Sequence, residues 1–149
     1  MALYPTWTMP PTAQQRAERQ PPVPFRKSFA FDFETGDFVQ TGCGRVSHCN
    51  GHEAWGAWCV KTVLTQRFAY LAYTANYGCE LDRIRSASRA VAEAEARRVI
   101  SEALLADPRT KSVDDFAFEW QGDALRVAFT ATPAVGTEKR IEVKLTYGN

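Results

Sequence analysis

The feature that most constrains the fold is a change of hydrophobic period near Pro108. Before it, apolar residues recur at helical spacing from Ala92 to Leu104, after a serine at 86 or 88 that can cap the helix. The helix must end near Ala106, because a proline disfavours helical geometry at the preceding residue. After Pro108 the period becomes two, over residues 116–120, 125–129 and 141–147. The second half of the chain therefore predicts one long helix followed by an antiparallel meander.

The first half predicts a hairpin and further helix. Three phenylalanines alternate with small or polar residues over 28–34, a Glu-Thr-Gly turn follows at 34–36, and residues 37–40 return. From Glu53 apolar residues take up helical spacing, which predicts one or two helices ending near Gly78. The predicted fold class is α+β, a single domain with an N-terminal β-hairpin and two to three helices packed on an antiparallel β-meander.

Residues 1–27 differ in composition from the rest of the chain. They are Pro-rich and polar, with Met9-Pro10-Pro11 and Pro21-Pro22-Val23-Pro24, and lack helical or strand periodicity. We expect an extended Pro-rich arm over 1–27 that lies along a neighbouring protein, and one domain over 28–149.

Charge and composition exclude several classes of partner. The net charge is +1, so no bulk field attracts nucleic acid or a membrane surface. No apolar run approaches the roughly 20 residues of a membrane helix, and the first residues lack the features of a secretory signal. We expect the protein to stay in the cytoplasm where it is made, with no nucleic acid and no membrane as partner, and with four free cysteine thiols.

A cluster of thiols and imidazoles is the main candidate for metal binding. Cys43, His48, Cys49 and His52 lie within ten residues, but structural zinc sites usually pair ligands from two separated segments. We therefore predict no metal and no cofactor. A catalytic carboxylate pair is also absent, because Asp114-Asp115 would point to opposite faces of a strand. A small zinc-stabilised adaptor and a cell-wall hydrolase remain as alternatives.

Several ordered blocks of sequence resemble one known family. They are Asp32-Phe33-Glu34-Thr35-Gly36, Leu64-Thr65-Gln66-Arg67-Phe68, Leu71-Ala72-Tyr73, Asn76-Tyr77-Gly78-Cys79-Glu80-Leu81, Ala103-Leu104-Leu105-Ala106-Asp107-Pro108-Arg109 and Val113-Asp114-Asp115-Phe116-Ala117-Phe118. From about residue 31 to 132 the chain is similar to the lysozyme-like baseplate wedge proteins of contractile-tail phages. That family is related to a type VI secretion baseplate subunit. The wider family carries a Glu-Pro-Arg signature at the end of its long helix. Asp107-Pro108-Arg109 falls in that place here, with aspartate instead of the longer glutamate.

The resemblance implies a structural subunit and not an enzyme. It implies a place in the virion, at the tail baseplate, with multiple copies around the tail axis. The implied partners are other wedge proteins, whose core helical bundle would bind at Asp107, Pro108 and Arg109, and the tail sheath protein. The first sheath ring would dock on exposed strands by β-augmentation, which would initiate sheath assembly. The last predicted strand is a candidate accessible edge for this docking: Arg140, Ile141, Glu142, Val143, Lys144 and Leu145.

Overall fold

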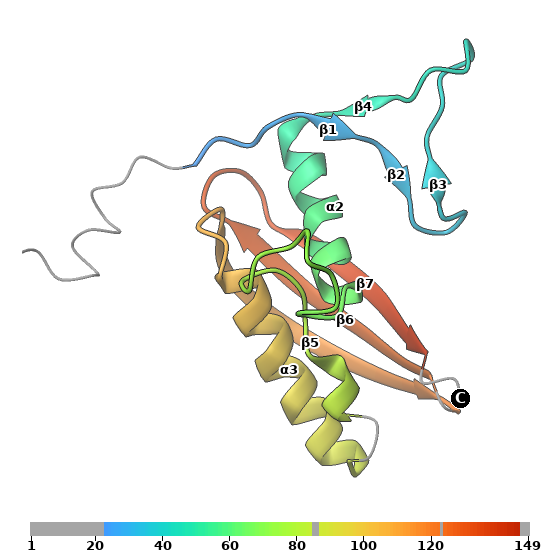
Figure 1. Cartoon of the computed structure of the whole chain (residues 1–149). Helices are drawn as coiled ribbons and strands as arrows, with labels where there is room; N and C mark the ends of the chain where they lie inside the picture. The colour runs from blue at the N-terminus through green and yellow to red at the C-terminus, as the bar shows by residue number, and fades with distance from the viewer. Residues whose placement is uncertain (1–22, 85–86, 123, 147–149) are drawn as a thin grey trace, which may run out of the picture.

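An antiparallel sheet of three long strands organises the protein (Figure 1). The structure is a computed structural model that describes residues 23–84, 87–122 and 124–146. The strands are β5 (Thr110–Gln121), β6 (Ala124–Pro133) and β7 (Lys139–Thr146), in the order β5-β6-β7. Each pairs antiparallel with the next along the chain, which confirms the predicted meander. The predicted arm lies outside the described residues except for its last five.

Helix α3 (Arg89–Leu105) is the helix expected from the apolar stripe. Ser88 occupies the N-cap position. All six stripe residues are buried: Ala92, Ala96, Val99, Ile100, Ala103 and Leu104. The helix ends before Asp107, as the following proline requires.

Helix α2 (Gly51–Leu64) begins two residues before the predicted start. Asn50 is its N-cap: the Asn50 side chain accepts from the Glu53 backbone, and the Glu53 carboxylate accepts from the Asn50 backbone. This capping box satisfies two backbone donors that the first turn leaves without partners. The helix buries Trp55 completely, and the Trp55 Nε1 donates to Thr110 Oγ1 at 3.2 Å.

The prediction that helix continues towards Gly78 is wrong. Helix α2 stops at Leu64, and residues 65–80 form a loop that leads to the short 3₁₀ helix η1 (Leu81–Ile84). Phe68 has a φ of 65°, which an α-helix cannot accommodate. The ends of the loop are held together, because Cys79 N donates to Thr65 O at 2.8 Å. Phe68 and Leu71, whose spacing predicted the continued helix, are exposed to solvent.

The N-terminal hairpin is present but is built from short strands. They are β1 (Ser28–Phe29), β2 (Phe31–Asp32), β3 (Asp37–Phe38) and β4 (His48–Cys49). β2 pairs with β3 around the predicted turn, where Gly36 has a φ of 74°, and β1 pairs with β4. This ribbon extends away from the helix and sheet body (Figure 1).

Both helices cover the same face of the sheet, and the core lies between the two layers (Figure 1). Phe129 on β6 and Trp55 on α2 are fully buried in this core. The opposite face of the sheet carries exposed charged side chains, including Arg126, Arg140 and Lys144. In the described part of the chain no helix is both long and apolar enough to cross a membrane.

Candidate functional site

The first candidate site is the exit of helix α3, at Asp107, Pro108 and Arg109. A tight turn follows the helix, because Thr110 N donates to Asp107 O at 3.0 Å. Within the turn, Asp107 Oδ1 accepts from the Arg109 backbone at 2.8 Å and from Arg109 Nε at 2.9 Å, and Asp107 Oδ2 accepts from Arg109 Nη2 at 2.7 Å. Pro108 is exposed at the tip. The three residues thus form one rigid unit.

The Arg109 guanidinium has a second contact, on helix α2. Its central carbon lies 5.2 Å from the centre of the Trp58 ring, which is a cation–π arrangement. Burial alone would raise the pKa of Asp107, but the hydrogen bonds and charge of Arg109 outweigh burial and hold that pKa below its usual value. Hydrogen bonding to Asp107 likewise raises the pKa of Arg109. Arg109 Nε and Nη2 both donate to Asp107, whereas Arg109 Nη1 has no hydrogen-bond partner among the described residues.

The second candidate site is the free edge of β7. Among the described strands β7 pairs only with β6, so within this part of the chain its other edge presents unpaired backbone groups. The predicted edge residues divide between the two faces of the sheet: Ile141, Val143 and Leu145 are buried, whereas Arg140, Glu142 and Lys144 are exposed.

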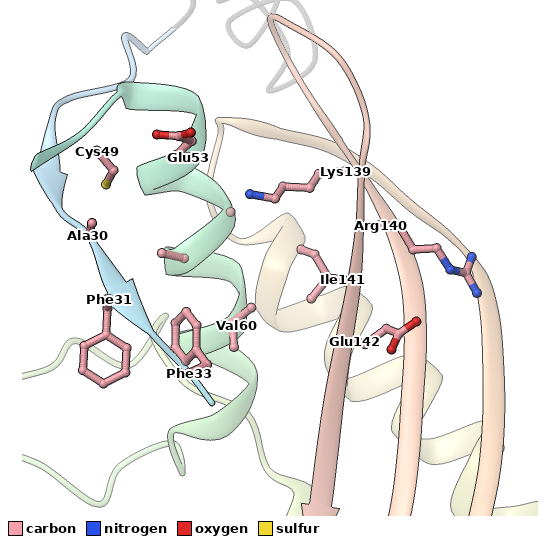
Figure 2. A pocket seen from close by; sticks show the side chains of 12 residues that line it. Ala30, Phe31, Phe33, Cys49, Glu53, Val60, Lys139, Arg140, Ile141 and Glu142 are labelled. Atoms are coloured by element: carbon pink, nitrogen blue, oxygen red, sulfur yellow. The ribbon is translucent and has the colours of Figure 1, made fainter. Parts of the chain in front are cut away.

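A groove of about 420 Å³ runs beside this edge (Figure 2). Helix α2 forms its floor, with Ala57 and Val60, while Phe31 and Phe33 of the hairpin line the opposite side. Four consecutive β7 residues, Lys139 to Glu142, line the groove. Successive side chains on a strand point to opposite faces, so a run of four indicates that the strand edge itself borders the groove.

Small residues on α2 make this groove. A Cβ added to Gly56 would lie 2.6 Å from Lys139 Nζ and 2.8 Å from Lys139 Cδ. The Lys139 side chain therefore crosses the helix at the one position in that turn that has no side chain. Glu53 and Glu142 also line the groove, so an occupant would meet charges of both signs beside the apolar rings.

The other edge of the sheet is less suited to pairing. Strand β5 has a register irregularity between Asp114 and Ala117, and Asp115 there has a φ of 52°. A bulge at a sheet edge interrupts the row of backbone groups that a further strand would need. It also breaks the strand alternation expected for the two aspartates, both of which are exposed.

The thiol and imidazole cluster is dispersed. Cys49 is buried with its thiol 3.5 Å from Ser28 O, and His48 stacks on Phe29 at 4.8 Å. His52 lies on α2, where its Nε2 is 2.8 Å from Thr137 O, and Cys43 is exposed in the hairpin loop. Among the described residues no group of three or more His, Cys, Asp or Glu side chains could hold a metal ion.

Sequence reasoning missed Trp58, Gly56 and Ala57 as site residues. Trp58 is part of the apolar pattern that begins at Glu53, which predicts a helix but no site. A signal for Gly56 was available, because a glycine inside a helix often marks the close approach of another element. Ala57 carries no such signal.

Comparison with known proteins identifies the family of the chain. Residues 27–136 match the model of a family described as contractile injection system sheath initiator. Phage-like element PBSX protein XkdS of Bacillus subtilis (strain 168) is 33% identical over 122 residues, covering 78% of this chain and 81% of that protein. The chain belongs to the contractile injection system sheath initiator family.

Proposed function

We propose that this protein is a baseplate wedge subunit that binds the core helical bundle at Asp107, Pro108 and Arg109 and receives the first sheath ring at the edge of β7. Membership of a sheath initiator family supports the coarser part, a structural role in a contractile tail with contact to the tail sheath. The observation that supports docking of the first sheath ring at β7 is the open edge of this strand beside a groove.

An added strand fits this edge for physical reasons. Backbone pairing along β7 would give affinity, and the groove would accept side chains of the incoming strand. The rings of Phe31 and Phe33 and the methyl groups of Val60 offer apolar contacts, while Lys139 and Glu53 offer charged ones. The bulge in β5 disfavours pairing at the opposite edge, so the sheet would extend in one direction only.

Filling the groove tests the sheath-docking part. Ala57→Trp places a large ring on the groove floor without changing β7, and Ala94→Trp places the same ring on the exposed side of α3. Both variants should keep the thermal transition of the parent within a few degrees, whereas only Ala57→Trp should abolish sheathed tails in electron micrographs. Sheathed tails at parental numbers with Ala57→Trp would refute the groove assignment.

The helix exit is tested separately. Arg109→Glu sets two carboxylates against each other and reverses the charge beside exposed Pro108. We expect reduced recovery of the protein with purified baseplate wedges. Arg45→Glu, the same charge reversal at an exposed position between β3 and β4, is the control and should bind normally. Equal recovery of both variants would remove Arg109 from the contact.

A further inference from the structure

A row of aromatic rings crosses the surface beside the helix exit. Trp58 lies 6.3 Å from Tyr77, Tyr77 lies 4.5 Å from Tyr73, and Tyr73 lies 6.0 Å from Tyr70. Trp58 and Tyr77 are half-buried, whereas Tyr73 and Tyr70 are 50% and 61% exposed. We call these four side chains the aromatic row. Aromatic rings that gather on one exposed surface are a candidate binding site.

The aromatic row is held in place by the rest of the fold. Turn hydrogen bonds order the segment that carries the tyrosines: Tyr73 N donates to Tyr70 O at 3.2 Å, and Tyr77 N donates to Thr74 O at 3.0 Å. The loop that carries the tyrosines is fixed by Arg67, whose Nε donates to Gly78 O at 3.2 Å and whose Nη1 lies 3.2 Å from Glu102 Oε1. A fixed series of rings suits an extended proline-rich segment, because such a segment binds aromatic-lined surfaces with little loss of conformational entropy.

The first described residues pack on helix α2, which also carries Trp58 of the aromatic row. The Phe25 ring lies 6.1 Å from Trp55 and 6.2 Å from His52, on the first turns of α2. Trp58 follows Trp55 by three residues, or about 4.5 Å along the helix axis. Phe25 therefore packs about one helical turn from Trp58, the end of the aromatic row that lies on α2.

The chain outside the described domain has the composition that this surface favours. Residues 1–22 contain five of the eight prolines in the protein. A proline-rich segment extends by about 3.1 Å per residue, so about six residues would cover the aromatic row and many would remain to reach it. Tethering also raises the local concentration of the segment to roughly the millimolar range, so even a weak contact would be occupied.

We propose that residues 1–22 dock on the aromatic row of the same chain, with proline rings packed against Tyr73 and Tyr70. The composition of the arm had suggested a neighbouring protein as its support, and the aromatic row offers one within the chain. The proposal is independent of sheath docking, because it uses neither β7 nor the groove.

Limited proteolysis of the full-length protein tests this docking. Trypsin can cut after Arg16 and Arg19, within the arm. The double variant Tyr70→Ala/Tyr73→Ala removes the two most exposed rings of the row. Cleavage at the arm sites should be about tenfold faster in this variant than in the parent, since cleavage follows the population of the undocked arm. Phe38→Ala, which removes an exposed ring from the hairpin, is the control and should leave the rate unchanged.

Two outcomes would overturn the proposal. Equal cleavage rates in the parent and in Tyr70→Ala/Tyr73→Ala would show that the arm does not use the aromatic row. Protection that weakens on dilution would show that the docked arm comes from a second copy, because docking within one chain does not depend on protein concentration.

Discussion

Replacing Asp107 by asparagine should destabilise the protein at neutral pH by about 1–2 kcal/mol. The side chains of Asp107 and Arg109 are only 18% and 21% exposed, and two parallel hydrogen bonds of 2.9 and 2.7 Å join them. Asparagine keeps the shape of the side chain but replaces one acceptor oxygen by an amide and removes the negative charge. The guanidinium then lies half-buried over Trp58 without its counter-charge.

The loss of unfolding free energy on Asp107→Asn should become smaller at acidic pH. The folded-state pKa of Asp107 is below its ordinary value, since the hydrogen bonds and charge of Arg109 outweigh the effect of burial. A depressed carboxyl pKa contributes stability that is present above the unfolded pKa, near 4, and is lost as pH falls through the folded value. The gap in unfolding free energy between parent and Asp107→Asn should therefore be constant above about pH 5 and narrow below about pH 4.

Urea unfolding followed by tryptophan fluorescence measures these differences. A double-mutant cycle with Arg109→Gln should return a coupling energy of about 1 kcal/mol or more, because each single variant removes the same interaction. Additive costs would mean that the two side chains act independently in solution. A gap that stays constant as the pH falls to about 3 would equally contradict the reasoning.

Three further outcomes check other parts of the structure. Gly78→Ala should cost about 1–3 kcal/mol in urea unfolding, because φ is 96° and the added Cβ would lie 2.9 Å from backbone atoms; a neutral effect would contradict the loop geometry. Phe129→Ala should cost about 3–5 kcal/mol, since the ring is fully buried in the core, and a cost under about 1 kcal/mol would place it elsewhere. Iodoacetamide at about pH 8 should modify Cys43 in the folded protein and leave Cys59 and Cys79 intact, because burial raises both their pKa values to about 12; modification of the buried pair at the rate of Cys43 would refute this.

Much of the fold was predictable because it follows from local periodicity. The apolar stripe of α3 and the alternation along β6 each indicate an element with one buried face. In the structure both faces pack into the same core. The loop after α2 was mispredicted because Phe68 and Leu71 have helical spacing yet are 71% and 108% exposed. One contact that fixes this loop joins Arg67 to Glu102 on α3, and no local pattern records a contact between segments so far apart.

The candidate sites were predictable to the extent that chain order determines them. The last strand of a meander is necessarily at an edge, and so is the first, so the pattern of residues could not choose between β7 and β5. The choice rests on two features without a local signature. One is the bulge at Asp115, which the alternation of β5 did not reveal. The other is the groove, which needs Gly56 on one element and Lys139 on another. An edge becomes a docking site only when the neighbouring surface can accept side chains, and that condition depends on packing between distant segments.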